Sequence, residues 1–141
     1  MKVLLVDDHT LFRQGLRRLL EMEVDLAVVG EAGSGQAAQQ MAHSLQPDVV
    51  LMDISMPDGD GLQATQGIMR DCPQTKIIIL SMHQEEEKVF QALRLGAHGY
   101  VLKDADSQEV AQAIRAAHRG NNFLSPAVAT RVVQRWRGVN G

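Results

Sequence analysis

The stretch "VVLMDISMPDGDGL" (Val49–Leu62) decides how this chain folds. It begins as a run of apolar residues, ends that run on a single acid, Asp53, and then turns through a proline and glycines into a helix-like pattern. A short, continuous apolar run is typical of a strand that is covered on both faces, because neither face then meets water. The stretch therefore predicts a buried strand that carries one carboxylate to its end.

Four more short apolar runs share this character and predict further strands. Each is too short for a helix and is rich in β-branched residues. The five runs cover residues 2–6, 26–30, 48–52, 76–80 and 99–102. The stretches with helical spacing cover residues 11–22, 34–45, 60–72, 85–97 and 106–120. This alternation predicts an α/β domain in which helices cover both faces of a parallel sheet.

Several residues indicate where the predicted helices begin, end and pack. Ser34 is the expected N-terminal cap of the second helix, and Gly96 and Gly120 are expected to end the fourth and fifth. A further helix begins at Ser125 and Pro126, with the serine as its cap and the proline in its first turn. The first helix carries five apolar residues that we expect to pack together: Leu11, Phe12, Leu16, Leu19 and Leu20.

Composition narrows the class of protein. The chain has 141 residues, of which 45% are hydrophobic and 22% charged, as expected for one globular domain with a proper core. The net charge is −3, so the chain does not have the excess of basic residues that is usual for a nucleic-acid-binding protein. The single cysteine, Cys72, excludes an internal disulfide and favours a reducing compartment. The N-terminus is not apolar for long enough to be a signal peptide or membrane span, so we expect a soluble, cytoplasmic protein with no membrane partner.

Polar side chains follow four of the predicted strands. Right-handed crossovers bring the carboxyl ends of parallel strands to one edge of the sheet, where ligands of such folds bind. We therefore expect the polar groups at these strand ends to form one constellation: Asp7, Asp8, Asp53, Ser81 and Lys103.

The charges of this constellation point to phosphoryl chemistry. At a separation of about 4 Å and an effective dielectric constant near 20, each pair of carboxylates repels by roughly 4 kcal/mol. Lys103 supplies one compensating charge, and a divalent cation with oxygen ligands, most simply Mg²⁺, would supply two more. Lys103 and the cation could neutralise phosphoryl oxygens, Ser81 could donate a hydrogen bond, and Asp53 is placed as the nucleophile.

Four motifs carry a family resemblance. The segments "VLLVDDHTLFRQGL", "PDVVLMDISMPDGDGL", "IIILSMH" and "GAHGYVLKD" resemble the receiver (REC) domain of two-component response regulators, and "DDHTLFRQGL" and "KDA" resemble its NarL/FixJ (LuxR-type) subfamily. The resemblance covers residues 1–120 and implies a flavodoxin-like (βα)5 fold, a doubly wound sandwich around a five-stranded parallel sheet of order 2-1-3-4-5. Residues 121–141, with "LSPAVATRVV", resemble the subfamily's linker helix toward a C-terminal helix-turn-helix DNA-binding domain, which is absent from this chain.

The resemblance implies a phosphorylation and metal site. Asp53 would accept a phosphoryl group from a sensor histidine kinase or a small phosphodonor. Mg²⁺, or Mn²⁺, would be bound by Asp8, by Asp53 and by the backbone carbonyl of Ser55, with Asp7 helping through water.

The resemblance also implies a switch. Lys103 would contact the phosphoryl group, Ser81 would move toward it, and Tyr100 would swing inward into the space that Ser81 vacates. An alternative for Tyr100 is an aromatic side chain at the rim of the sheet. The local charge change would bias a two-state surface. The implied partners are the kinase, a second copy of the chain on phosphorylation, and DNA only through the absent domain. Self-catalysed phosphoryl uptake and autodephosphorylation would be the only enzymatic activity.

Some positions depart from the family pattern or have an ordinary explanation. Asp104 follows Lys103 where many receivers have a proline in a cis peptide, so a cis bond is not assumed. Ser55 and His83 would flank the path of attacking water and could tune the lifetime of the phosphate. We expect the ring of His9 to point away from the acids. The two acids that follow the acceptor strand, Asp58 and Asp60, are interpreted as loop and helix-cap residues.

Two other functions compete with the receiver hypothesis. An aspartate-nucleophile phosphohydrolase of the haloacid-dehalogenase type needs an acid two residues after its nucleophile, but Ser55 follows Asp53 and His9 follows Asp7 at that spacing. A receiver fold that binds partners without phosphorylation usually loses an acid or the lysine, and this chain retains both.

Overall fold

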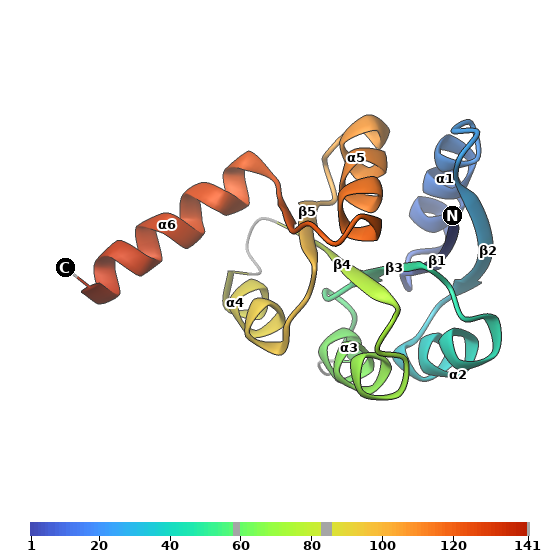
Figure 1. The fold of residues 1–141 in the computed structure, drawn as a ribbon, viewed down its shortest axis with the longest axis horizontal. Coiled ribbons are helices and arrows are strands. Elements are labelled where there is room, and N and C mark those ends of the chain that lie inside the picture. Colours follow the sequence, from blue (N-terminus) through green and yellow to red (C-terminus); the bar gives the residue numbers. More distant parts are fainter. Residues whose placement is uncertain (58–59, 83–85, 141) are drawn as a thin grey trace.

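The predicted parallel α/β architecture is confirmed by the computed structural model, which describes residues 1–57, 60–82 and 86–140 (Figure 1). One sheet has the strand order β2-β1-β3-β4-β5-β6, and every pair of neighbouring strands is parallel. The strands are β1 (Lys2–Val6), β2 (Ala27–Ala32), β3 (Val49–Asp53), β4 (Lys76–Ser81), β5 (Gly99–Leu102) and β6 (Phe123–Leu124).

Helices cover both faces of the sheet. α1 and α5 lie on one face, and α2, α3 and α4 lie on the other (Figure 1). The helices are α1 (Thr10–Leu20), α2 (Gly35–Leu45), α3 (Asp60–Asp71), α4 (Glu86–Leu95), α5 (Ser107–His118) and α6 (Pro126–Asn140). No described helix combines the length and the apolarity that crossing a bilayer requires.

The central strands are buried on both faces, as their continuous apolar character predicts. In β1, Val3 and Leu5 join the core cluster beneath α1 and α5, whereas Leu4 and Val6 join the cluster beneath α2, α3 and α4. Successive side chains of a strand point to opposite faces, so a strand between two helical layers needs an apolar residue at every position. This double burial fixes β1 and β3 rigidly and holds the residues at their carboxyl ends in place.

The strand count is a correction, because the sheet has six strands where five were expected. Phe123 N–H donates to the His98 carbonyl (3.2 Å) and Ser125 N–H to the Tyr100 carbonyl (3.0 Å), which adds β6 beside β5. The segment after residue 120 is thus joined to the body of the domain, and Val128 of α6 is buried in its core. Val132 packs against the same core cluster, and the C-terminal end of α6 extends away from the body (Figure 1).

The predicted helix signals at Ser34, Gly96 and Gly120 are confirmed, but one expected cap is not. The Ser34 side chain accepts a hydrogen bond from Ala37 N–H (3.2 Å), and Gly96 and Gly120 adopt φ of 101° and 87°. Ser125 directly precedes α6, yet its buried hydroxyl has no hydrogen-bond partner among the described residues. The expected serine cap of α6 is therefore wrong in this structure.

The expected apolar stripe of α1 is only half right. Leu16 and Leu20 are buried and Phe12 is half-buried, whereas Leu11 is 85% and Leu19 48% exposed. Successive side chains of an α-helix are rotated by about 100° around the helix axis. The line Phe12, Leu16 and Leu20 therefore faces the sheet, while the neighbouring line of Leu11 and Leu19 faces outward.

Candidate functional site

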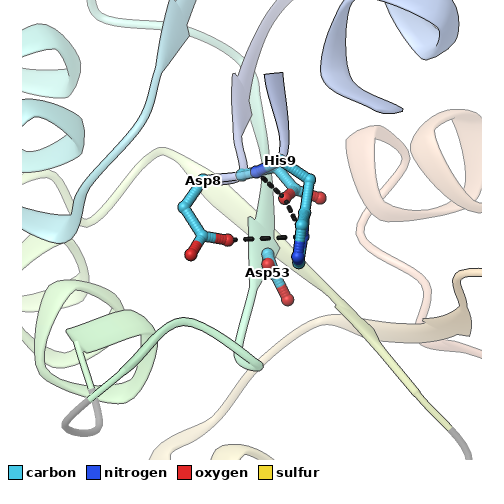
Figure 2. A group of neighbouring side chains, drawn as sticks. Asp8, His9 and Asp53 are labelled. Carbon is cyan, nitrogen blue, oxygen red and sulfur yellow. Dashed lines mark hydrogen bonds and ion pairs between the residues drawn. The ribbon is translucent and has the colours of Figure 1, made fainter. Parts of the chain in front are cut away.

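The polar residues predicted at the strand ends lie together at the carboxyl edge of the sheet. Asp7 and Asp8 follow β1, and Asp53 ends β3. One potential ligand atom from each of Asp7, Asp8, His9 and Asp53 lies within 4.8 Å of the others. Figure 2 shows the side chains of Asp8, His9 and Asp53 converging from these strand ends. Asp7 and Asp53 are buried and Asp8 is 34% exposed, so Asp8 is the acid most open to solvent.

Lys103 places the positive charge of the site. Its Nζ lies 2.9 Å from Asp7 Oδ2 and 3.1 Å from Asp53 Oδ2, and its side chain is only 8% exposed. Burial by itself lowers the pKa of the ammonium, but the contacts with the two carboxylates outweigh burial and raise the pKa of Lys103 above its ordinary value. Lys103 therefore stays charged at neutral pH.

Asp53 is held by two donors at the end of its strand. Its Oδ1 accepts a hydrogen bond from Ser55 N–H (2.7 Å), and its Oδ2 accepts one from Lys103 Nζ (3.1 Å). Burial, the largest effect, raises the pKa of the Asp53 carboxyl, and the negative charge of Asp7 adds to this; the Ser55 amide and Lys103 oppose it. The side chain is thus a fixed, poorly solvated carboxyl group, and any added positive charge stabilises its ionised form.

His9 lies in the cluster, which corrects the expectation that its ring points elsewhere. His9 Nδ1 is 3.1 Å from Asp7 Oδ1, 3.4 Å from Asp8 Oδ1 and 3.3 Å from Lys103 Nζ. The backbone N–H of His9 also donates to Asp7 Oδ1 (2.8 Å), which folds the residue back over the acids (Figure 2). The sequence held a signal for this, since an imidazole directly after two acids can reach them through a short turn.

Ser81 and Tyr100 are joined inside the protein. The Tyr100 hydroxyl donates to Ser81 Oγ, and the Ser81 hydroxyl donates to the Met82 carbonyl (2.9 Å). Tyr100 has no exposed surface, so the alternative of a rim aromatic is wrong. A buried tyrosine hydroxyl needs a hydrogen-bond partner, and here that partner is the serine at the end of β4.

The remaining predicted positions separate into near and distant ones. The Ser55 hydroxyl is buried beside the site and has no partner among the described residues. Asp60 begins α3, and its carboxylate accepts from Gly35 N–H (2.5 Å) at the start of α2, outside the acid cluster. Asp58 and His83 lie outside the described residues. The Lys103–Asp104 peptide bond is trans.

Gly61 supports the site and was missed by sequence reasoning. A Cβ atom at Gly61 would overlap the Asp53 carbonyl oxygen and would lie 2.9 Å from Ile54 Cα. The absence of a side chain therefore allows the first turn of α3 to pack directly on the backbone at the end of β3. The glycine that follows Asp60 was a visible signal, but only the structure shows what approaches it.

The donor set suits a hard divalent cation. Three carboxylates converge, and Lys103 is the ammonium group that contacts two of them. Carboxylate oxygens are the ligands that Mg²⁺ prefers, and a site with more negative than positive charge favours its binding. The residues present therefore fit Mg²⁺ or Mn²⁺.

Comparison with known proteins defines the class. Residues 3–115 match the model of the response regulator receiver domain, so the chain belongs to the response regulator receiver family of two-component systems. Among curated relatives, oxygen regulatory protein NreC of Staphylococcus carnosus is 42% identical over 134 residues, which cover 94% of this chain and 62% of NreC. Response regulator protein VraR of Staphylococcus aureus is 39% identical over 137 residues, which cover 97% of this chain and 66% of VraR.

Solved structures indicate the subfamily to which this chain is similar. A two-component response regulator of the LuxR family from Aurantimonas sp. superposes with a TM-score of 0.89 at 36% identity, over 95% of this chain and 96% of that one. The isolated REC domain of RcsB from Salmonella enterica superposes with a TM-score of 0.82 at 31% identity, over 92% of this chain and 96% of that domain. This chain is thus a receiver domain related to LuxR-family transcription regulators, and it spans about two thirds or less of the curated relatives named above.

Proposed function

We propose that this receiver domain takes a phosphoryl group onto Asp53 from a sensor histidine kinase and changes conformation to control a transcriptional output. The observation that carries the proposal is the buried Asp53 carboxylate, which is held 3.1 Å from the Lys103 ammonium beside two further acids. A carboxylate fixed at the end of a rigid strand is preorganised for attack on phosphorus.

The reaction forms a bond between an Asp53 carboxylate oxygen and phosphorus. The bond from phosphorus to the nitrogen of a phosphohistidine, or to the oxygen of a small phosphodonor, breaks, and the leaving atom keeps the electron pair. An imidazole nitrogen then takes a proton from solvent, whereas acetate leaves as the carboxylate. Lys103 neutralises charge on the transferred oxygens, since its ammonium already lies at the acceptor. Mg²⁺ would supply further positive charge there, held by Asp8, Asp53 and the Ser55 backbone carbonyl, with Asp7 acting through water.

The switch follows from the hydrogen bonds of Ser81. In this structure its hydroxyl donates to Met82 O, so it must exchange that acceptor for a phosphoryl oxygen when it moves toward the site. Tyr100 is already buried with its hydroxyl on Ser81 Oγ, so it moves further into the space that Ser81 vacates instead of swinging in from the surface. The change at Asp53 is thereby transmitted to β5 and to the neighbouring surfaces of α4 and α5.

The proposal extends to the organisation of the longer protein. Residues 1–120 form the phosphorylated unit, and residues 121–141 form a linker toward a helix-turn-helix DNA-binding domain. The support comes from relatives named as regulators that are longer than this chain, including transcriptional regulatory protein DegU of Brevibacillus brevis. DNA contact would come through that further domain, with dimerisation on phosphorylation and a cytoplasmic location.

Intact-mass spectrometry tests the chemistry. With acetyl phosphate and Mg²⁺, the parent gains one adduct of about 80 Da, as expected for a covalent phosphoryl group on the protein, and Asp53→Asn does not. Asp60→Asn is the matched control, because Asp60 lies nearby but outside the cluster. Many turnovers of phosphate from ordinary monoesters would indicate a phosphohydrolase instead. No adduct and no response to Mg²⁺ or beryllofluoride would indicate a binding module that works without phosphorylation.

A further inference from the structure

An aromatic ring contacts the Lys103 ammonium in addition to the acids. Lys103 Nζ lies 5.0 Å from the centroid of the Phe12 ring. A cation within about 6 Å of an aromatic centroid is attracted by the negative face of the ring. Phe12 lies on α1, far from Lys103 in the sequence, so the contact exists only through the fold.

The Phe12–Lys103 pair stands between two cavities. One, of about 260 Å³, is an apolar groove between α1 and α5, and the other, of about 480 Å³, is lined by His9, Ser81 and Met82. Phe12 and Lys103 are the two residues common to both linings. Both cavities therefore border Lys103, whose long stem is flexible, so the groups that contact its ammonium decide where it points.

The Phe12 ring is held in place by the core. Phe12 is half-buried and packs against the core cluster that contains Leu16 and Leu80. It belongs to the same line of α1 as the buried Leu16 and Leu20, so its orientation is set by the packing of the helix on the sheet.

The ring and the acids hold Lys103 by different means. The attraction of Asp7 and Asp53 for the ammonium weakens when a divalent cation neutralises these carboxylates. The phenyl ring is uncharged and does not bind the metal, so its attraction for Lys103 persists. The two contacts therefore complement each other between the metal-free and the metal-loaded site.

We propose that Phe12 is a positioning residue, whose ring face keeps the Lys103 ammonium at the acceptor carboxylate after a divalent cation has taken over the charge of the acids. The consequence for phosphoryl binding rests on the proposed function, whereas the restraint on Lys103 does not.

The first test measures the mobility of Lys103. The side chain is followed by NMR relaxation of ¹³C-labelled lysine ε-methylenes in the full chain, assigned with Lys103→Arg, without and with Mg²⁺. The parent and Phe12→Tyr keep Lys103 ordered in both conditions. In Phe12→Leu, Lys103 should stay ordered without Mg²⁺, because the acids still hold it. With Mg²⁺ bound, Lys103 should become mobile in this variant. If Lys103 in Phe12→Leu stays as ordered as in the parent with Mg²⁺ bound, the proposal is wrong.

The second test separates the charge of the ring face from its shape. Mono-, di- and trifluorinated phenylalanine at position 12 weaken the negative face of the ring stepwise with little change in size. The dissociation constant for beryllofluoride in Mg²⁺ should rise with each fluorine, toward the loss of about 2- to 30-fold that complete removal of a cation–π contact produces. The same analogues at Phe123, which packs on the same cluster, should leave the constant unchanged.

The outcomes of this second test are distinguishable. A flat response across the fluorinated series at position 12, with the parent binding beryllofluoride, overturns the role of Phe12 alone. Failure of the parent to bind beryllofluoride overturns the proposed function, and the relaxation measurement then still decides whether Phe12 restrains Lys103.

Discussion

At the scale of single residues, the acid site depends on atoms that come very close. The Asp53 carboxylate has one oxygen on the Ser55 amide and the other on Lys103, so neither oxygen is free to rotate away. Its backbone is equally confined, because α3 begins directly against it at Gly61. Small changes at these contacts are therefore expected to affect both stability and metal binding.

Replacing Gly61 by alanine should destabilise the protein by about 1–3 kcal/mol, the usual cost of forcing an extra methyl group into a packed site. The new Cβ meets backbone atoms of Asp53 and Ile54, which cannot move aside as a side-chain tip could. Urea unfolding measures the loss, and Mg²⁺ affinity should fall with it. Gly15→Ala is the matched control: it lies inside α1 with nothing within 4 Å of its added Cβ, and should stabilise by about 0.5–1 kcal/mol. Equal effects of both substitutions would contradict this account of Gly61.

Replacing Lys103 by methionine should leave the buried acids without their cation. The expected loss of unfolding free energy at neutral pH is about 3 kcal/mol, as for other buried pairs that lose one partner. Added Mg²⁺ should restore more stability to this variant than it adds to the parent, because the metal then supplies the missing charge. Urea unfolding with and without Mg²⁺ measures both, and equal stabilisation of the two proteins would count against charge compensation by Lys103.

At the scale of elements, one histidine joins two neighbouring strands. His98 precedes β5. Its ring Nδ1 accepts a hydrogen bond from the Ile77 backbone N–H (3.1 Å), and the His98 backbone N–H donates to the Ile77 carbonyl (2.8 Å). Burial, and to a lesser degree the charge of Lys76, lower the pKa of His98 below its ordinary value of 6.5. The ring is therefore neutral in the folded protein and fixed as an acceptor.

This arrangement predicts a loss of stability in mild acid. The unfolded chain takes up a proton on His98 near its ordinary pKa, before the folded protein does. The stability due to the neutral ring is thus complete above pH 6.5 and declines as pH falls toward the folded pKa. Between pH 7 and pH 5, the unfolding free energy of the parent should fall more than that of His98→Asn, which does not titrate. Parallel curves for the two proteins would show that His98 does not carry this effect.

Helix α6 is held to α4 by a second cation–π contact. The Arg135 guanidinium lies 4.1 Å from the Phe90 centroid, and its Nη1 lies 2.6 Å from Glu87 Oε1. A double-mutant cycle of Arg135→Ala and Phe90→Leu, measured by urea unfolding, should give a coupling energy of about 0.5–1 kcal/mol, since the contact is partly exposed. Additive effects of the two substitutions would mean that α6 is not fastened to α4 at this point.

At the scale of the whole molecule, the sequence predicted the sheet and the convergence at its edge. Continuous apolar runs such as those of β1 and β3 admit few arrangements, and parallel strands must bring their carboxyl ends together. Strand β6 could not be predicted, because two residues carry no periodicity and pair only where β5 offers a free edge. The outward line of Leu11 and the inward turn of His9 likewise depend on neighbours that are distant in sequence or on local backbone angles.

For the whole domain, the proposed function depends on Asp53 as the residue that carries the phosphoryl group. Acylphosphates are reduced by borohydride, so protein treated with acetyl phosphate and Mg²⁺ can be reduced, digested and mapped by peptide mass spectrometry. We expect Asp53, and no other aspartate, to be converted to homoserine, and only when Mg²⁺ is present. Conversion of Asp7 or Asp8 in its place, or of no aspartate at all, would contradict it.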